Sequence, residues 1–185
     1  VGELICAGLN NNLLAEELSP SLSFLERKLC KWFCEKLGLG DLSGGVAVSG
    51  GSLSNLMALV MARSIAGLES DPSAVFFASD DSHVSLLKAV RIMGLKKESL
   101  QKVPTDEKGK LNISCLESIF KKIKSEGKKC FAVVATAGTT VRGAIDPLSE
   151  IAQFCQKEKI WLHIDGAIGG VYGLSSITSE LLDGL

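Results

Sequence analysis

The stretch CFAVVATAGTT, residues 130–140, indicates the fold class. It is apolar from Cys130 to Ala135, so a strand built from it would be apolar on both faces, because successive side chains point to opposite sides. A short strand that is apolar on both faces is typical of a parallel sheet with helices on either side. Such a sheet needs further strands separated by helices.

The remainder of the chain supplies that alternation. Short apolar runs predict strands at VAVS (46–49), AVFFAS (74–79), a weaker run near 100–103, CFAVVAT (130–136) and IWLHID (160–165). Helical patterns lie between them at 52–66, 82–93, 113–126 and 147–158. Glycines stand where three of these helices should end, at Gly67, Gly94 and Gly127. We therefore expect an α/β fold, a three-layer α/β/α sandwich with a mainly parallel sheet.

Two amphipathic helices are predicted ahead of this repeating unit, at 3–17 and 20–37. The second begins with Ser19 as its N-cap and Pro20 as its first residue. Its apolar side chains share one face, at Leu22, Leu25, Leu29 and Phe33. We expect residues 1–45 to form a helical segment that packs on a large domain formed by residues 46–185.

Composition limits the classes of protein to consider. The 185 residues are 46% hydrophobic and carry a net charge of −1, which favours neither nucleic acid nor an anionic membrane as a partner. The apolar runs are too short to span a bilayer, and we expect a cytoplasmic protein. The six cysteines show no C-x-x-C spacing, so we expect reduced, mostly buried thiols and no metal site.

The unusual residues follow the predicted strands. Gly50, Gly51 and Ser52 follow VAVS, His83 follows AVFFAS, Thr136 ends the third of these runs and Asp165 ends IWLHID. Ligands of open α/β sheets bind beyond the carboxyl ends of the strands. Taken singly, each feature also has an ordinary explanation, such as a tight turn capped by Ser52 or a surface histidine. Asp165 is the strongest signal, because a buried acid needs a cationic or hydrogen-bonding partner.

Four motifs together resemble the group II pyridoxal-phosphate-dependent decarboxylases, the family of glutamate, aromatic amino acid and diaminobutyrate decarboxylases. The match runs through nearly the whole chain in the family's order: NNNLLAEELSPSLSFLERKLCKWF (10–33), SGGSLSNLMALVMAR (49–63), DDSHVSLLKAVRIMGL (80–95) and ATAGTTVRGAIDPLSEIAQFCQKEKIWLHIDGAIGG (135–170). The resemblance implies the aspartate aminotransferase-like large domain of fold type I, a homodimer, and a lyase of amino-acid metabolism. It implies pyridoxal 5'-phosphate as cofactor and an amino acid as substrate.

The same resemblance implies a role for each candidate residue. Asp165 would pair with the protonated pyridine nitrogen, and His83 would stack on the ring and assist proton transfer, which makes these two the catalytic candidates. The remaining cofactor contacts would come from Gly51 and Ser52 at the phosphate, Thr136 beside the ring and Ala167 beneath it.

The chain departs from the family in two ways. Gly166 stands where the family often has alanine, and the Schiff-base lysine of the family has no counterpart, since the last lysine is Lys159, which precedes Asp165. We expect a fragment of the large domain that lacks the lysine region and the small C-terminal domain, and that is inactive alone. Two alternatives stay open: another fold-type I lyase, such as one acting on a phosphorylated amino alcohol as in sphingosine-phosphate lyase, or a non-catalytic module that retains the fold.

Overall fold

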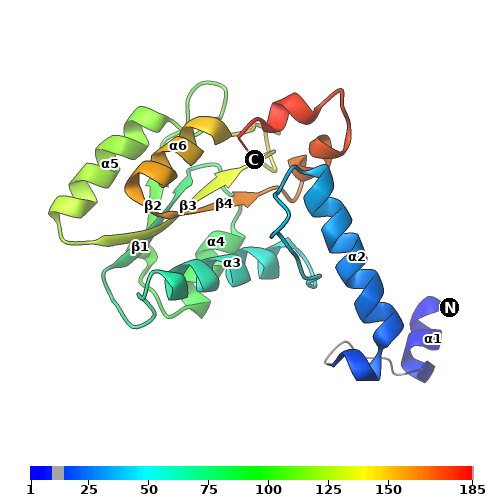
Figure 1. Ribbon diagram of the computed structural model, residues 1–185. Coiled ribbons are helices and arrows are strands. Elements are labelled where there is room, and N and C mark those ends of the chain that lie inside the picture. Colours follow the sequence, from blue (N-terminus) through cyan, green and yellow to red (C-terminus); the bar gives the residue numbers. More distant parts are fainter. Residues whose placement is uncertain (10–14, 185) are drawn as a thin grey trace. The chain divides into compact units, whose positions relative to one another are not determined.

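The computed structural model describes residues 1–9 and 15–184 of the chain (Figure 1). The chain divides into two compact units, Val1–Ala47 and Val48–Leu185. This division falls close to the boundary expected at residue 45. The expectation that the first unit packs on the second stays a prediction.

The first unit contains helix α1 (Gly2–Leu9), the short 3-10 helix η1 (Glu16–Leu18) and helix α2 (Pro20–Lys36). A single helix over 3–17 is therefore wrong: α1 ends at Leu9, Ala15 is extended, and residues 10–14 lie outside the described residues. Arg27 of α2 holds η1 through a two-pronged pair with Glu16, at 2.6 and 2.7 Å. Pro20 begins α2 as predicted, and the Ser19 carbonyl accepts the first helical bond from the Ser23 N–H at 3.0 Å.

The second unit is built on a parallel sheet in the order β2-β1-β3-β4. The strands are β1 (Ala74–Ser79), β2 (Leu100–Val103), β3 (Lys129–Thr136) and β4 (Trp161–Asp165). The helices are α3 (Gly51–Ile65), α4 (Ser85–Ile92), α5 (Ile113–Ser125) and α6 (Leu148–Glu158), with short 3-10 turns η2 (Lys97–Ser99), η3 (Gly169–Leu174) and η4 (Ser179–Leu182). Gly67, Gly94 and Gly127 follow helices with positive φ angles, as predicted.

The strand predicted at 46–49 is wrong. Residues Val46, Ala47 and Ser49 are exposed, and no strand of the described sheet pairs with this segment. Glycine pairs flank it on both sides, and the Ala47 N–H donates to the Glu26 carboxylate at 2.9 Å instead of to a neighbouring strand. A short apolar run forms a strand only where a partner strand can complete the hydrogen-bond ladder.

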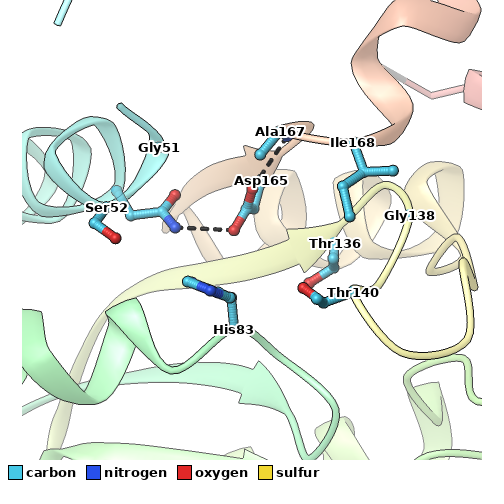
Figure 2. A pocket seen from close by; sticks show the side chains of 10 residues that line it. Gly51, Ser52, His83, Thr136, Gly138, Thr140, Asp165, Ala167 and Ile168 are labelled. Atoms are coloured by element: carbon cyan, nitrogen blue, oxygen red, sulfur yellow. Dashed lines mark hydrogen bonds between the residues drawn. The ribbon is translucent and has the colours of Figure 1, made fainter. Parts of the chain in front are cut away.

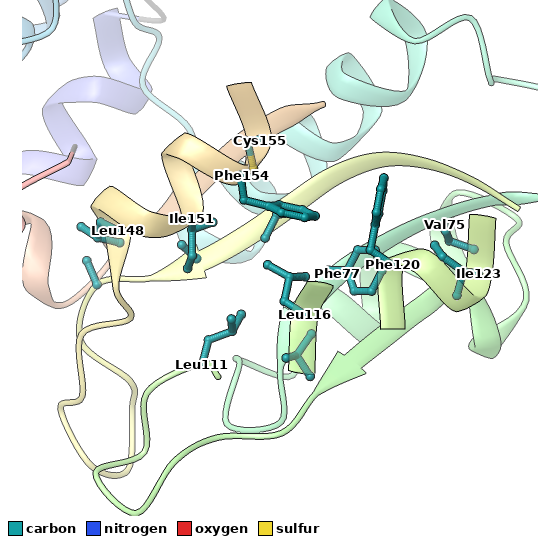
Figure 3. Close-up of a cluster of buried hydrophobic side chains, with 14 of the residues drawn as sticks. Val75, Phe77, Leu111, Leu116, Phe120, Ile123, Leu148, Ile151, Phe154 and Cys155 are labelled. Atoms are coloured by element: carbon teal, nitrogen blue, oxygen red, sulfur yellow. The ribbon is translucent and has the colours of Figure 1, made fainter. Parts of the chain in front are cut away.

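Both faces of the sheet are buried, which confirms the three-layer α/β fold. Val75, Phe77 and Val133 pack with α5 and α6 on one face, in the cluster drawn in Figure 3. Phe76 and Val134 point to the opposite face and pack with α3 and α4. Figure 1 shows these two helix pairs on opposite sides of the strands. Successive side chains of β1 and β3 point to opposite faces, and both faces are buried. Consecutive residues of these strands are therefore apolar.

No described helix combines the length and the apolar character that crossing a membrane would require. All six cysteines are unpaired, with Cys34 and Cys155 buried and Cys6 exposed.

The turns after β3 and β4 touch each other through glycine. The Gly169 N–H donates to the Ala137 carbonyl at 2.8 Å, and Gly138 takes a φ of 89° beside it. A Cβ atom on Gly169 would lie 2.5 Å from the Ala137 oxygen, closer than any real contact, whereas one on Gly170 would meet nothing within 4 Å. Close approach of two backbones thus requires glycine at 169 and permits a side chain at 170.

We predict that Gly169→Ala lowers the free energy of unfolding by about 1–3 kcal/mol, the usual cost of forcing atoms into filled space. Gly170→Ala, one residue away, is the matched control and should change the unfolding free energy by less than about 0.5 kcal/mol. Urea denaturation followed by circular dichroism measures both. Equal effects of the two substitutions would show that the turns do not approach as described.

Candidate functional site

A cavity of about 290 Å³ opens at the carboxyl ends of β3 and β4, beside the first turn of α3 (Figure 2). All six residues predicted from the sequence line it, together with four that were not predicted as site residues. The lining residues are Gly51, Ser52, Asn55, His83, Thr136, Gly138, Thr140, Asp165, Ala167 and Ile168. Asn55, Thr136 and Asp165 form a buried polar floor, while Ser52, His83, Thr140 and Ala167 are exposed at its rim.

The N-terminus of α3 forms one wall. Gly50 precedes the helix with a φ of 128°, and its carbonyl accepts from the Leu53 and Ser54 N–H groups at 3.0 and 3.1 Å. Gly51 and Ser52 occupy the first turn, where backbone N–H groups have no partner within the helix. These N–H groups and the helix dipole favour an anion such as a phosphate. Phosphate binding at this helix stays a prediction, and the helix follows a glycine turn rather than a strand of the described sheet.

Asp165 ends β4 and is 9% exposed. Its Oδ2 accepts from the Asn55 side-chain amide at 2.8 Å, and its Oδ1 accepts from the Ala167 N–H at 3.2 Å. Both donors are neutral, and none of the ion pairs among the described residues includes Asp165. The carboxylate is thus hydrogen-bonded but has no cation beside it, so a cationic group in the cavity would be stabilised there.

Asn55 connects several elements, a role that the sequence did not reveal. It is 3% exposed on α3, and its amide nitrogen donates to Ser85 Oγ on α4 at 2.9 Å as well as to Asp165. Its Oδ1 lies 2.7 Å from Nε2 of His163 on β4. Burial lowers the pKa of His163, while the nearby Asp165 charge acts in the opposite direction. Sequence spacing could have placed Asn55 one turn into α3, but only the fold brings its partners together.

Thr136 lies at the end of β3, paired in register with Asp165. Its side chain is buried, and its Oγ1 has no hydrogen-bond partner among the described residues. Buried hydroxyl groups without a partner are uncommon in folded proteins. Thr136 is one of the residues that line the cavity, while its Oγ1 atom itself is enclosed by protein.

Asp146 holds the Thr136 backbone in place. Its Oδ2 accepts from the Thr136 N–H at 2.7 Å, its Oδ1 accepts from the Leu111 N–H at 2.8 Å, and its own N–H donates to the Thr136 carbonyl at 2.9 Å. Burial raises the pKa of Asp146, although the two backbone hydrogen bonds partly oppose this shift. The sequence analysis missed this residue, because an isolated acid before Pro147 resembles an ordinary turn.

Within the described residues, no cluster of histidine, cysteine, aspartate or glutamate side chains is arranged to hold a metal ion. The cavity itself offers backbone N–H donors for an anion at α3 and a buried carboxylate for a cation at the end of β4.

Comparison with known proteins gives a consistent family. The model of the pyridoxal-dependent decarboxylase conserved domain matches residues 1–185. An aromatic-L-amino-acid decarboxylase of Bacillus atrophaeus is 37% identical over 186 residues, which cover 100% of this chain and 38% of the relative. A cysteine sulfinic acid decarboxylase of Rattus norvegicus is 36% identical over 191 residues, with coverage of 100% and 38%.

A solved structure agrees with these relatives. The glutamate decarboxylase domain of a Vibrio parahaemolyticus protein, described as diaminobutyrate-pyruvate transaminase and L-2,4-diaminobutyrate decarboxylase, superimposes with a TM-score of 0.91 at 32% identity. The match covers 98% of this chain and 42% of that one. The chain thus spans about two fifths of the length of the proteins it matches.

We predict that Asp146→Ala lowers the free energy of unfolding by about 2–4 kcal/mol, because it leaves the N–H groups of Leu111 and Thr136 buried without acceptors. Asp183→Ala, at an exposed acid, is the matched control and should have little effect. Urea denaturation of both variants tests the difference.

The pH dependence of this loss follows from the raised pKa of Asp146. A carboxyl group whose pKa is raised by folding contributes most below its unfolded pKa, about 3.9, and its contribution falls as the pH rises through the folded value. The gap between wild type and Asp146→Ala should therefore narrow from acidic toward neutral pH. A gap that widens over that range would contradict the assigned direction.

Proposed function

This chain belongs to the pyridoxal-dependent decarboxylase family, and on that basis we propose that its protein is a lyase that removes the carboxyl group of an amino acid with pyridoxal phosphate as cofactor. The chain matches 38% of its relative's length, so the proposed activity belongs to the whole protein. The observation that carries the proposal is one cavity that joins the anion-binding end of α3 to the buried Asp165 carboxylate.

The residues of the cavity fit this cofactor. Its phosphate suits the N–H groups of Gly51 and Ser52, and its protonated ring nitrogen suits Asp165, which has only neutral partners in the described structure. Thr136, whose Oγ1 has no partner among the described residues, lies beside Asp165 at the same edge of the sheet. The volume of about 290 Å³ is at the lower end of small-molecule sites, which range from roughly 300 to 1,000 Å³.

When bound, pyridoxal phosphate supplies an electron sink for the electron pair left by the departing carbon dioxide. Asp165 would keep a proton on the ring nitrogen, because a carboxylate beside a cation favours the charged form. His83 and Ala167 would lie against the ring, where a small methyl group permits close approach and an imidazole can stack and move protons. These roles of Gly51, Ser52, His83, Thr136, Asp165 and Ala167 are those expected from the sequence.

No lysine lines the cavity within the described residues. We infer that the lysine which family members link covalently to this cofactor comes from sequence outside the 185 residues. The chain alone would then bind the cofactor reversibly and would not turn over an amino acid, since covalent catalysis needs that nucleophile.

The relatives act on amino acids with different side chains, as their names state. Relatives named for aromatic amino acids and for cysteine sulfinic acid match almost equally, at 37% and 36% identity. The two alternatives, a lyase acting on phosphorylated amino alcohols and a non-catalytic module, are not favoured, because the family model and these relatives are decarboxylases.

A homodimer and a cytoplasmic location stay predictions. Three apolar side chains of α2, Phe24, Leu25 and Leu29, are 60%, 58% and 51% exposed. An apolar stripe of this kind supports association with another surface.

We predict that Asp165→Asn weakens reversible binding of pyridoxal phosphate at least tenfold, because it removes the charge of a charge-assisted hydrogen bond while keeping the side chain's shape. Asp183→Asn, an exposed aspartate, is the matched control and should bind as the wild type does. Equilibrium dialysis measures the affinity. Borohydride reduction and peptide mapping identify cofactor attached to surface lysines, which is subtracted.

Two results would contradict this proposal. Equal reversible affinity of the wild type and Asp165→Asn would remove Asp165 from the site. Amino-acid turnover by the unmodified chain would show that the covalent lysine is not supplied from outside it.

A further inference from the structure

Ser85 and Asn55 have no role in the function proposed above, yet both are buried polar residues, 1% and 3% exposed. Together they connect Asp165 to both histidines of the chain, His83 and His163. The hydrogen-bond directions along this connection can be derived from one fixed end, the carboxylate.

A carboxylate oxygen accepts hydrogen bonds, so the group of Asn55 that faces Asp165 Oδ2 at 2.8 Å is its NH₂. The Asn55 carbonyl oxygen then faces His163 Nε2 at 2.7 Å. Because that oxygen can only accept, Nε2 of His163 carries a proton. The orientation of the amide and the proton position on His163 are thus both fixed by Asp165.

The second N–H of the Asn55 amide points to Ser85 Oγ at 2.9 Å. Since Ser85 Oγ accepts there, its own hydrogen is available to His83 Nδ1, which lies 2.9 Å away. The backbone N–H of Ser85 reaches the same Nδ1 at 3.2 Å. A backbone N–H can only donate, so Nδ1 must present its single lone pair on this side, and the Ser85 hydroxyl is then a second donor to the same nitrogen.

We propose that Asn55 and Ser85 are positioning residues that hold the proton of neutral His83 on Nε2, so that the ring offers an N–H donor to the cavity that it lines. Nδ1 is occupied by Ser85, which leaves Nε2 as the nitrogen available to a ligand. His83 would therefore donate a hydrogen bond from Nε2 to a bound group, rather than accept one there. The proton position belongs to the chain itself and is measured without cofactor or substrate, so its test is independent of the proposed function.

The test is nitrogen-15 NMR of the histidine rings at about pH 8.5, where free imidazole is neutral. The chain contains two histidines, so a His163→Gln variant assigns the spectrum. We expect Nδ1 of His83 to resonate as a non-protonated nitrogen and Nε2 as a protonated one, and Nε2 of His163 also to be protonated.

Ser85→Ala removes the hydroxyl donor and leaves the backbone N–H. Loss of one hydrogen bond should raise the ratio of the Nδ1–H to the Nε2–H form of His83 about fivefold. Asn55→Leu should change His83 in the same direction, because Ser85 Oγ is no longer held as an acceptor. The matched control is Ser79→Ala, at a serine that is also fully buried but whose Oγ has no partner; it should leave both rings unchanged.

A proton on Nδ1 of His83 in the wild type would overturn the proposal. An unchanged ratio of the two His83 tautomers in Ser85→Ala would also overturn it. An equal rise of that ratio in Ser79→Ala would overturn it as well, because it would show a nonspecific effect of removing a buried hydroxyl. If Asn55→Leu fails to fold, the wild-type spectrum and the two serine variants still decide the question.

Discussion

The buried hydrogen bond from Asn55 to Asp165 is the constraint on which the site depends. It joins the first turns of α3 to the end of β4, which are 110 residues apart in the sequence. Without it, Asp165 would keep one backbone donor in a buried setting, and an under-bonded buried carboxylate is costly. The same amide holds Ser85 on α4 and His163 on β4, so one side chain joins α3, α4 and β4 beneath the cavity.

The parallel sheet explains why these groups can meet at all. Thr136 and Asp165 pair in register at the carboxyl ends of adjacent strands. The Asp146 carboxylate holds the backbone of Thr136 by accepting a hydrogen bond from its N–H. The helices that cover the two faces bury Phe76 and Phe77 in opposite directions, which leaves the strand ends as the place where polar groups reach solvent. Packing thus sets the position of the site, and a few buried polar residues set its chemistry.

The sheet could be predicted from the sequence because apolar runs such as CFAVVAT are local patterns. Gly51, His83 and Asp165 stood out because each follows or ends a predicted strand, and all three line the cavity. Asn55 and Asp146 were missed because their hydrogen bonds join elements that lie far apart in the chain. The strand predicted at VAVS was wrong because a strand also needs a neighbouring strand to pair with. The free hydroxyl of Thr136 likewise becomes visible only when its surroundings are known.

We propose that this cavity is built around a ligand with an anion at one end and a cation at the other. A crystal structure of the protein with pyridoxal phosphate would show where the two ends lie. We expect the phosphate on the N–H groups of Gly51 and Ser52 and the ring nitrogen on Asp165. A cofactor bound elsewhere, or bound with its phosphate toward Asp165, would rule out this arrangement.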